Sequence, residues 1–156
     1  MEDSNAKIPD VYGIVTLDDA ECREILTRQR MCVLATADGD QPYAVPVFYG
    51  FDGATVYLGI AEGRKSQVLD MNPRLCVTIA EVGPGDSWRS VLVIGRAEWI
   101  EDGPERTEAI RVMMEHNRRP ERQIKTGASA AASPQRHRRG RMLRIADAQI
   151  TGRAKG

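Results

Sequence analysis

The chain has 156 residues, about the size of one domain, and its 22 basic residues balance 22 acidic ones. This even charge provides no overall field to attract nucleic acid or a membrane surface. The N-terminus MEDSNAKIPD has no apolar signal core, and no apolar run approaches the roughly 18 residues that a membrane span needs. We therefore expect a single domain over residues 1–156, with no nucleic-acid or membrane partner and a cytoplasmic location.

The first predicted element is a helix over residues 16–29. Thr16 precedes Asp19 by three positions, which is a weak capping box. Apolar side chains recur on one side of this helix at Leu17, Ala20, Ile25 and Leu26. The acidic residues near its start suit the positive end of the helix dipole, so we interpret them as structural. They are Asp18, Asp19, Glu21 and Glu24.

The rest of the chain reads as strands with two further helices. Strands are predicted over residues 31–37, 42–51, 54–60, 74–80, 87–100 and 139–150, and helices over 64–71 and 103–117. Asp-Gly turns at 38–39 and 52–53 separate the first three strands, which favours hairpins. Six strands and about three helices in this order predict an antiparallel α+β barrel rather than a doubly wound parallel sheet. Residues 119–139, rich in Ala, Ser and Arg, predict a mobile loop, and Gly95 a corner in a long strand.

The stretch GIAEGRKSQVLDMNP places two cations, Arg64 and Lys65, at the start of the short helix. Cations there are unfavourable, because the first turn has unpaired N–H groups and the positive end of the dipole. A bound phosphate would reverse that effect, since helix N–H groups and adjacent cations both favour an anion. The alternative is that both side chains extend into water, where screening makes the repulsion negligible.

Pro46 lies in the middle of the predicted strand 42–51, where its missing N–H removes a ladder hydrogen bond. The strand is therefore an edge strand or irregular. A gap in pairing would expose backbone groups that could bind a planar heterocycle such as a flavin. A proline that merely protects an edge from aggregation explains the residue equally well.

Residues for metal or covalent catalysis are few. The only histidines are His116 and His137, which leaves little material for a histidine triad or a His-rich metal site. Cys22, Cys32 and Cys76 lie among apolar residues at spacings that fit no zinc site, so we interpret them as reduced core thiols. Chemistry without a metal would then come from a cofactor. Arginines in and after the predicted loop could contact phosphates of nucleic acid, but no aromatic platform accompanies them.

Several short motifs of this sequence, taken in chain order, resemble those of a known family. The order AT-x-DG-x-P, GRK, NP, SV-x-x-x-G-x-A and TG-R resembles the pyridoxamine 5'-phosphate oxidase-like flavoproteins of the FMN-binding split β-barrel fold. Within that family, the chain most resembles the nitroimidazole-resistance (Nim-type) branch. The resemblance runs from Thr16 to Lys155, apart from residues 119–139.

The resemblance implies a homodimer with FMN at the subunit interface. Arg64 and Lys65 would hold the FMN phosphate, with Ser66 as a further donor. The implied cofactor-binding residues are Val45, Pro46, Val47, Phe48, Leu58, Gly59, Arg64, Lys65, Ser66 and Ser90. Of these, residues 45–48 form the strand whose backbone faces the isoalloxazine, 58–59 run beside the ribityl chain and ring, and Ser90 lies near the edge of the ring. Trp88 would cover the cofactor.

The function that follows is a flavin-dependent oxidoreductase acting on a small molecule. No catalytic residue and no metal ligand is assigned. Gly59 stands where Nim-type relatives often carry a histidine proposed to act in their chemistry, so the resemblance does not extend to antibiotic reduction. The alternative is a non-catalytic module that binds or senses a flavin, a deazaflavin or haem.

Overall fold

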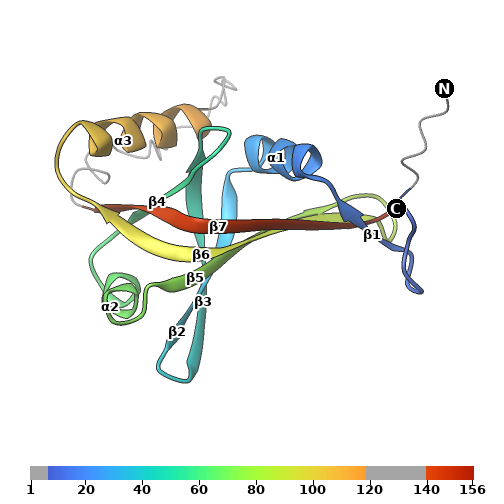
Figure 1. Ribbon diagram of the computed structural model, residues 1–156, viewed down its shortest axis with the longest axis horizontal. Coiled ribbons are helices and arrows are strands. Elements are labelled where there is room, and N and C mark those ends of the chain that lie inside the picture. Colours follow the sequence, from blue (N-terminus) through green and yellow to red (C-terminus); the bar gives the residue numbers. More distant parts are fainter. Residues whose placement is uncertain (1–6, 119–139) are drawn as a thin grey trace, which may run out of the picture.

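The computed structural model describes residues 7–118 and 140–156. Its elements are β1 (Ile14–Leu17), α1 (Asp19–Arg28), β2 (Met31–Asp38), β3 (Gln41–Phe51), β4 (Val56–Ile60), α2 (Arg64–Met71), β5 (Arg74–Val82), β6 (Trp88–Ile100), α3 (Pro104–His116) and β7 (Arg141–Lys155) (Figure 1). The loop predicted over residues 119–139, with His137 and most of the arginine cluster, lies outside the described residues.

Six antiparallel strands close into a barrel in the order β7-β4-β3-β2-β5-β6, with β6 returning to β7. The predicted fold class, an antiparallel six-stranded α+β barrel with three helices, is therefore confirmed. The long strands β6 and β7 bend at Gly95, where the pairing register shifts between Ile94 and Arg96. A Cβ atom at Gly95 would stand 2.6 Å from the Ala146 carbonyl oxygen, so the close approach of the two backbones requires glycine there.

The barrel interior is filled by alternate residues of the strands, as the period of two requires. On β2, for example, Cys32 and Leu34 are buried while Met31 and Val33 are exposed. Helix α1 packs Ile25 and Leu26 into this core, both fully buried. The Tyr49 hydroxyl donates to the Leu26 carbonyl at 2.7 Å, so the largest buried side chain has its polar atom satisfied.

The start of the first helix differs from the prediction. Thr16 does not begin the helix but lies on a seventh strand, β1, where it pairs with Arg153 of β7. The helix cap is Asp18, whose carboxylate accepts from the Glu21 N–H at 2.9 Å while Glu21 accepts from the Asp18 N–H at 2.8 Å. The cause is the length of β7, which continues to Lys155 and gives residues 14–17 a partner far away in the sequence.

None of the helices in the described parts of the chain has the length and hydropathy needed to cross a bilayer. The three cysteines are free: Cys22 and Cys32 are buried and Cys76 is half-buried.

Candidate functional site

The barrel is open along part of β3. This strand pairs with β2 over all eight residues from Gln41 to Phe48, but with β4 only through Tyr49, Gly50 and Phe51. No other strand of the described sheet covers the remaining edge. Residues 41–48 of β3 therefore have a hydrogen-bonding ladder on one side and an open edge on the other.

Pro46 lies on this open edge. The Tyr49 N–H donates to the Arg30 carbonyl at 3.1 Å, toward the β2 side. Because successive backbone groups of a strand point to opposite sides, those of Phe48, Pro46 and Ala44 face the open edge. The missing N–H of Pro46 thus costs no ladder bond, which explains how proline sits within a strand that is otherwise paired.

The four predicted residues of this strand divide into two pairs. The side chains of Val45 and Val47 pack toward the core, and their backbones pair with Leu34 and Cys32. Pro46 and Phe48 face outward, and Phe48 is 55% exposed. Only the second pair therefore offers both backbone groups and side-chain surface to a ligand.

The start of α2 lies beside the tip of the β2–β3 hairpin. The Arg64 guanidinium stands over the Tyr43 ring at 4.6 Å, and an Arg64 nitrogen is 3.7 Å from a carboxylate oxygen of Asp38. At the other end of the helix, the Asn72 amide donates to the Ala37 carbonyl at 3.4 Å. These contacts bring the start of α2 to Tyr43, which lies in the stretch of β3 that has the open edge.

The charges at the start of α2 are poorly compensated. The first turn of α2 contains no acidic residue, and Glu62, which precedes it, has its carboxylate 3.5 Å from the Ser66 hydroxyl rather than on either cation. Lys65 is half-buried and makes no ion pair with any described residue, and Arg64 has only the long, exposed contact to Asp38. The positive end of the helix and two cations thus coincide, which is the electrostatic arrangement that favours a phosphate.

Ser66 shapes this turn from inside. It is buried, and its Oγ accepts from the Gly63 N–H at 3.1 Å and donates to the Gly63 carbonyl at 2.9 Å. Gly63 has φ 146°, a conformation that L side chains rarely adopt. The Ser66 hydroxyl is therefore already engaged in holding the helix start.

Leu58 and Gly59 lie where β4 separates from β3. Leu58 is the last β4 residue paired with β3, through Tyr49, and its side chain is fully buried. Gly59 follows and pairs only with Met142 of β7. Because Leu58 is buried and Gly59 has no side chain, β4 could contact a ligand here only through its backbone.

Ser90 is not brought to the other predicted residues within one chain. It pairs with Ala80 of β5 and Arg153 of β7. Three strand spacings separate β6 from β3 in either direction around the barrel, ~14 Å along the sheet. Ser90 and Trp88 therefore lie on the wall opposite the open edge.

Sequence reasoning missed the residues that fasten α2 from the side. Arg141 of β7 contacts both carboxylate oxygens of Asp70, at 2.9 and 2.8 Å, and its guanidinium lies 3.6 Å from the centroid of the Trp99 ring. We call this contact the Arg141–Asp70 brace. Its partners are 71 positions apart in sequence, and no local pattern joins them.

Burial shifts the pKa values of one cysteine and of the described histidine away from reactivity at neutral pH. Burial raises the pKa of the Cys32 thiol to about 12, which leaves it unreactive at neutral pH. Burial also lowers the pKa of His116, whose Nε2 donates to the Gln29 carbonyl at 2.7 Å. Within residues 7–118 and 140–156 there is no cluster of three or more His, Cys, Asp or Glu side chains that could hold a metal ion.

The chain is similar to known proteins over most of its length. The sequence profile described as pyridoxamine 5'-phosphate oxidase matches residues 18–154. The crystal structure of an FAD-binding protein from Mesorhizobium loti is 32% identical, with a TM-score of 0.70, over 92% of this chain and 99% of that one. A protein from Bacteroides thetaiotaomicron assigned to 5-nitroimidazole antibiotic resistance is 25% identical, with a TM-score of 0.68, over 90% of this chain and 87% of that one.

A curated relative from Rhizobium meliloti (strain 1021) is 34% identical over 76 residues, 49% of this chain. The match spans half of that relative's length, 50%.

Proposed function

The chain belongs to the pyridoxamine 5'-phosphate oxidase family, and from this premise we propose that it binds a flavin mononucleotide and uses it to oxidise or reduce a small molecule. One observation carries the proposal: two cations without adequate counter-charge stand at a helix start beside an open strand edge. The similarity to an FAD-binding protein over nearly the whole chain supports a flavin as the ligand.

The phosphate would bind at Arg64 and Lys65. Lys65 makes no ion pair with a described carboxylate, and the first α2 turn adds the positive end of the helix dipole. Arg64 would exchange its long contact with Asp38 for a charge-assisted hydrogen bond. The single phosphate of FMN matches a site with two adjacent cations.

The ring would lie along the open edge of β3. The Phe48 N–H and the carbonyls of Pro46 and Phe48 face that side, and a flavin carries both donors and acceptors on its rim. When bound, the flavin would supply the electron transfer. The chain's own residues anchor the phosphate, orient the ring and exclude water from one face.

We also propose that the molecule is a homodimer. The outer face of β2, β3 and β6 exposes large apolar side chains. They are Met31 (49% exposed), Val33 (40%), Phe48 (55%) and Ile94 (48%). Cross-strand pairing makes the face continuous, since Met31 lies opposite Phe48 and Cys76 of β5 lies opposite Ile94. A second copy is the simplest cover for such a face.

The dimer would also explain Ser90. Within one chain this residue lies on the wall opposite the open edge, so it cannot line a flavin bound at β3 of the same subunit. Ser90 shares the outer face of the sheet with the apolar residues, and a two-fold partner packed on that face would bring its own Ser90 toward the flavin. The cofactor site would then be complete only at the interface.

The test compares FMN with riboflavin, which lacks the phosphate. We expect the purified protein to absorb at about 450 nm as flavins do, and Arg64→Met and Lys65→Met each to weaken FMN binding about tenfold or more, the value of a charged hydrogen bond. Riboflavin should bind weakly and equally to wild type and variants. Arg74→Met, which removes an exposed arginine at the start of β5, is the matched control and should leave FMN binding unchanged.

A colourless protein that takes up no FMN would overturn the proposed site, as would equal loss of riboflavin and FMN in the two variants. Turnover is measured separately, by anaerobic reduction with NADPH followed by an electron acceptor. Flavin binding without any turnover would favour the non-catalytic module instead. Uptake of haem or a deazaflavin in preference to FMN would replace the cofactor proposed here.

A further inference from the structure

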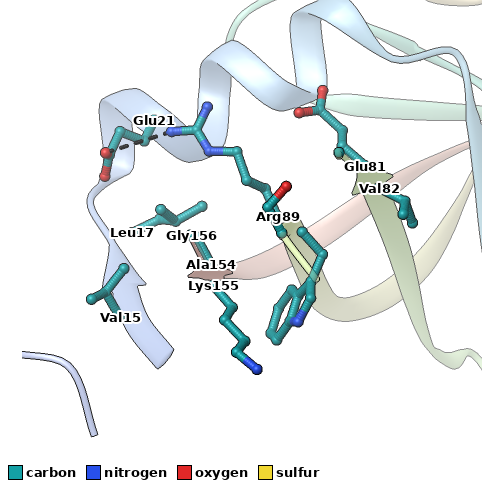
Figure 2. A pocket seen from close by; sticks show the side chains of 12 residues that line it. Val15, Leu17, Glu21, Glu81, Val82, Arg89, Ala154, Lys155 and Gly156 are labelled. Atoms are coloured by element: carbon teal, nitrogen blue, oxygen red, sulfur yellow. Dashed lines mark ion pairs between the residues drawn. The ribbon is translucent and has the colours of Figure 1, made fainter. Parts of the chain in front are cut away.

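A cavity of about 450 Å³ opens at the far end of β7 from α2 (Figure 2). Its walls come from β1, α1, the β5–β6 hairpin and the last residues of β7. Apolar side chains form much of the surface, among them Val15, Leu17, Val82 and Trp88. The volume lies within the range of small-molecule sites, about 300 to 1,000 Å³.

The carboxylates of this cavity are already engaged. Glu81 accepts from Arg28 at 2.8 and 2.7 Å and from the Gln29 amide at 2.8 Å. Glu21 accepts from the Asp18 N–H at 2.8 Å and also pairs with Lys7. A cationic ligand would find both acidic groups occupied by other donors.

The cationic side chains of the cavity make fewer or longer contacts than its carboxylates. Lys155 lines the cavity, and its ammonium group makes no ion pair or hydrogen bond with any described residue. The Arg89 guanidinium is 3.7 Å from a Glu21 oxygen, longer than a hydrogen bond. Figure 2 shows Lys155 and Arg89 extending along different sides of the cavity. A ligand therefore meets one ammonium group, that of Lys155, without a partner among the described residues, while the side-chain carboxylates of Glu21 and Glu81 are already held by other donors.

Trp88 adds a flat aromatic surface next to the free ammonium group. It is the cross-strand partner of Lys155 in the β6–β7 ladder, so the two side chains stand on the same face of the sheet. A ligand ring placed against the indole would be within reach of the Lys155 side chain, and aromatic pairs add to the gain from burial alone.

We propose that this cavity binds an aromatic carboxylate, with its ring against Trp88 and the neighbouring Val82 and its carboxylate on Lys155. Arg89, on the other side, contributes longer-range attraction. Within one chain this cavity lies away from the proposed phosphate site, because α2 and Lys155 lie at opposite ends of β7.

The test uses 2-naphthoate and its neutral counterpart 2-naphthamide, titrated calorimetrically into the full chain. We expect 2-naphthoate to bind, Lys155→Met to weaken it about tenfold, and Arg89→Met to weaken it by a factor of about two to five. In a Trp99→Phe background, where Trp88 is the remaining tryptophan, the ligand should quench the fluorescence. Arg153→Met removes the same charge two residues away on β7, outside the cavity, and should change nothing.

Three results would overturn the proposal: no binding of 2-naphthoate at millimolar concentration, equal affinity for the amide, or equal loss in Arg153→Met and Lys155→Met. Titration of Arg64→Met keeps this site distinct from the flavin site. We expect its affinity for 2-naphthoate to equal that of wild type whether or not the chain binds FMN.

Discussion

Arg64 and Lys65 are adjacent cations with different surroundings. Arg64 lies on the Tyr43 ring near Asp38, which offsets part of its charge. Lys65 is half-buried without a counter-ion among the described residues. The unfavourable charge at the start of α2 is therefore concentrated on Lys65. A phosphate would relieve it, so the residue that weakens the free protein is the one that strengthens the complex.

Glu81 is the opposite case, a carboxylate with full compensation, and it predicts a pH effect. Hydrogen bonding by Arg28 lowers its pKa in the folded protein, against the opposing effect of burial. The stability from this carboxylate is thus present above the unfolded pKa and is lost as the pH falls through the lower folded pKa. We expect Glu81→Gln to lower the urea concentration at the unfolding midpoint at pH 7. In wild type this midpoint should fall as the pH drops from about 5 to about 3, where glutamate side chains are protonated, and in Glu81→Gln it should fall less.

Glu24→Gln is the matched control for Glu81→Gln, since Glu24 also pairs with Arg28 at 2.8 Å but its side chain is 60% exposed. An exposed pair of this kind contributes little to stability. If the urea midpoint depends on pH in the same way in wild type and Glu81→Gln, the Arg28–Glu81 pair does not contribute to stability.

At the scale of the elements, local patterns predicted most of the barrel. The Asp-Gly turns and the alternation of apolar residues located β2 to β6, and Gly63 and Pro73 framed α2 at its observed bounds. The prediction failed at β1, because four residues carry no periodic signal and their partner is the end of β7. The sequence predicted a phosphate site at Arg64 and Lys65 but gave no sign of Asp38 and Tyr43, since only tertiary packing brings the β2–β3 hairpin to α2.

The Arg141–Asp70 brace is the element-scale prediction. It ties α2 to β7 and so fixes where the helix start stands relative to β3. Under the proposed function, Asp70→Asn and Arg141→Gln should each weaken FMN binding about two- to fivefold, the value of one partly exposed ion pair. Riboflavin binding should not change, because it does not use the helix start.

A double-mutant cycle distinguishes positioning from general damage. The double variant Asp70→Asn/Arg141→Gln should bind FMN about as well as either single variant, because each already breaks the same contact. Glu98→Gln breaks the neighbouring Glu98–Arg144 pair, which does not touch α2, and is the control. Additive losses in the double variant would contradict the brace.

At the scale of the whole molecule, the barrel separates the proposed functions. The open edge and α2 lie at one end of β7 and the cavity beside Lys155 at the other, while the apolar outer face runs across β3, β2, β5 and β6. A single chain leaves that face in water and Ser90 far from the open edge. A single subunit interface would therefore both cover the apolar outer face and bring Ser90 of the partner subunit to the proposed flavin site.

This dimer is tested by placing a charge at the centre of the face. Val33 pairs with Pro46 and Thr78 across neighbouring strands and points outward, so Val33→Asp should leave the fold intact by circular dichroism. Burying the unpaired carboxylate in an interface should raise the dimer dissociation constant by at least about a hundredfold, giving monomer in light scattering at micromolar concentration. Met114→Asp places the same charge on an exposed methionine of α3, away from the face, and should stay dimeric.

Thiol labelling reads the same equilibrium independently. Cys76, half-buried on the outer face, should react slowly in concentrated wild type and faster on dilution or in Val33→Asp, whereas Cys32 stays protected by burial throughout. The dimer proposal would be wrong if the wild-type protein were monomeric at every concentration and Cys76 reacted equally fast in wild type and Val33→Asp. Ser90 would then have no flavin within reach, because the wall that carries it faces away from β3 of its own chain.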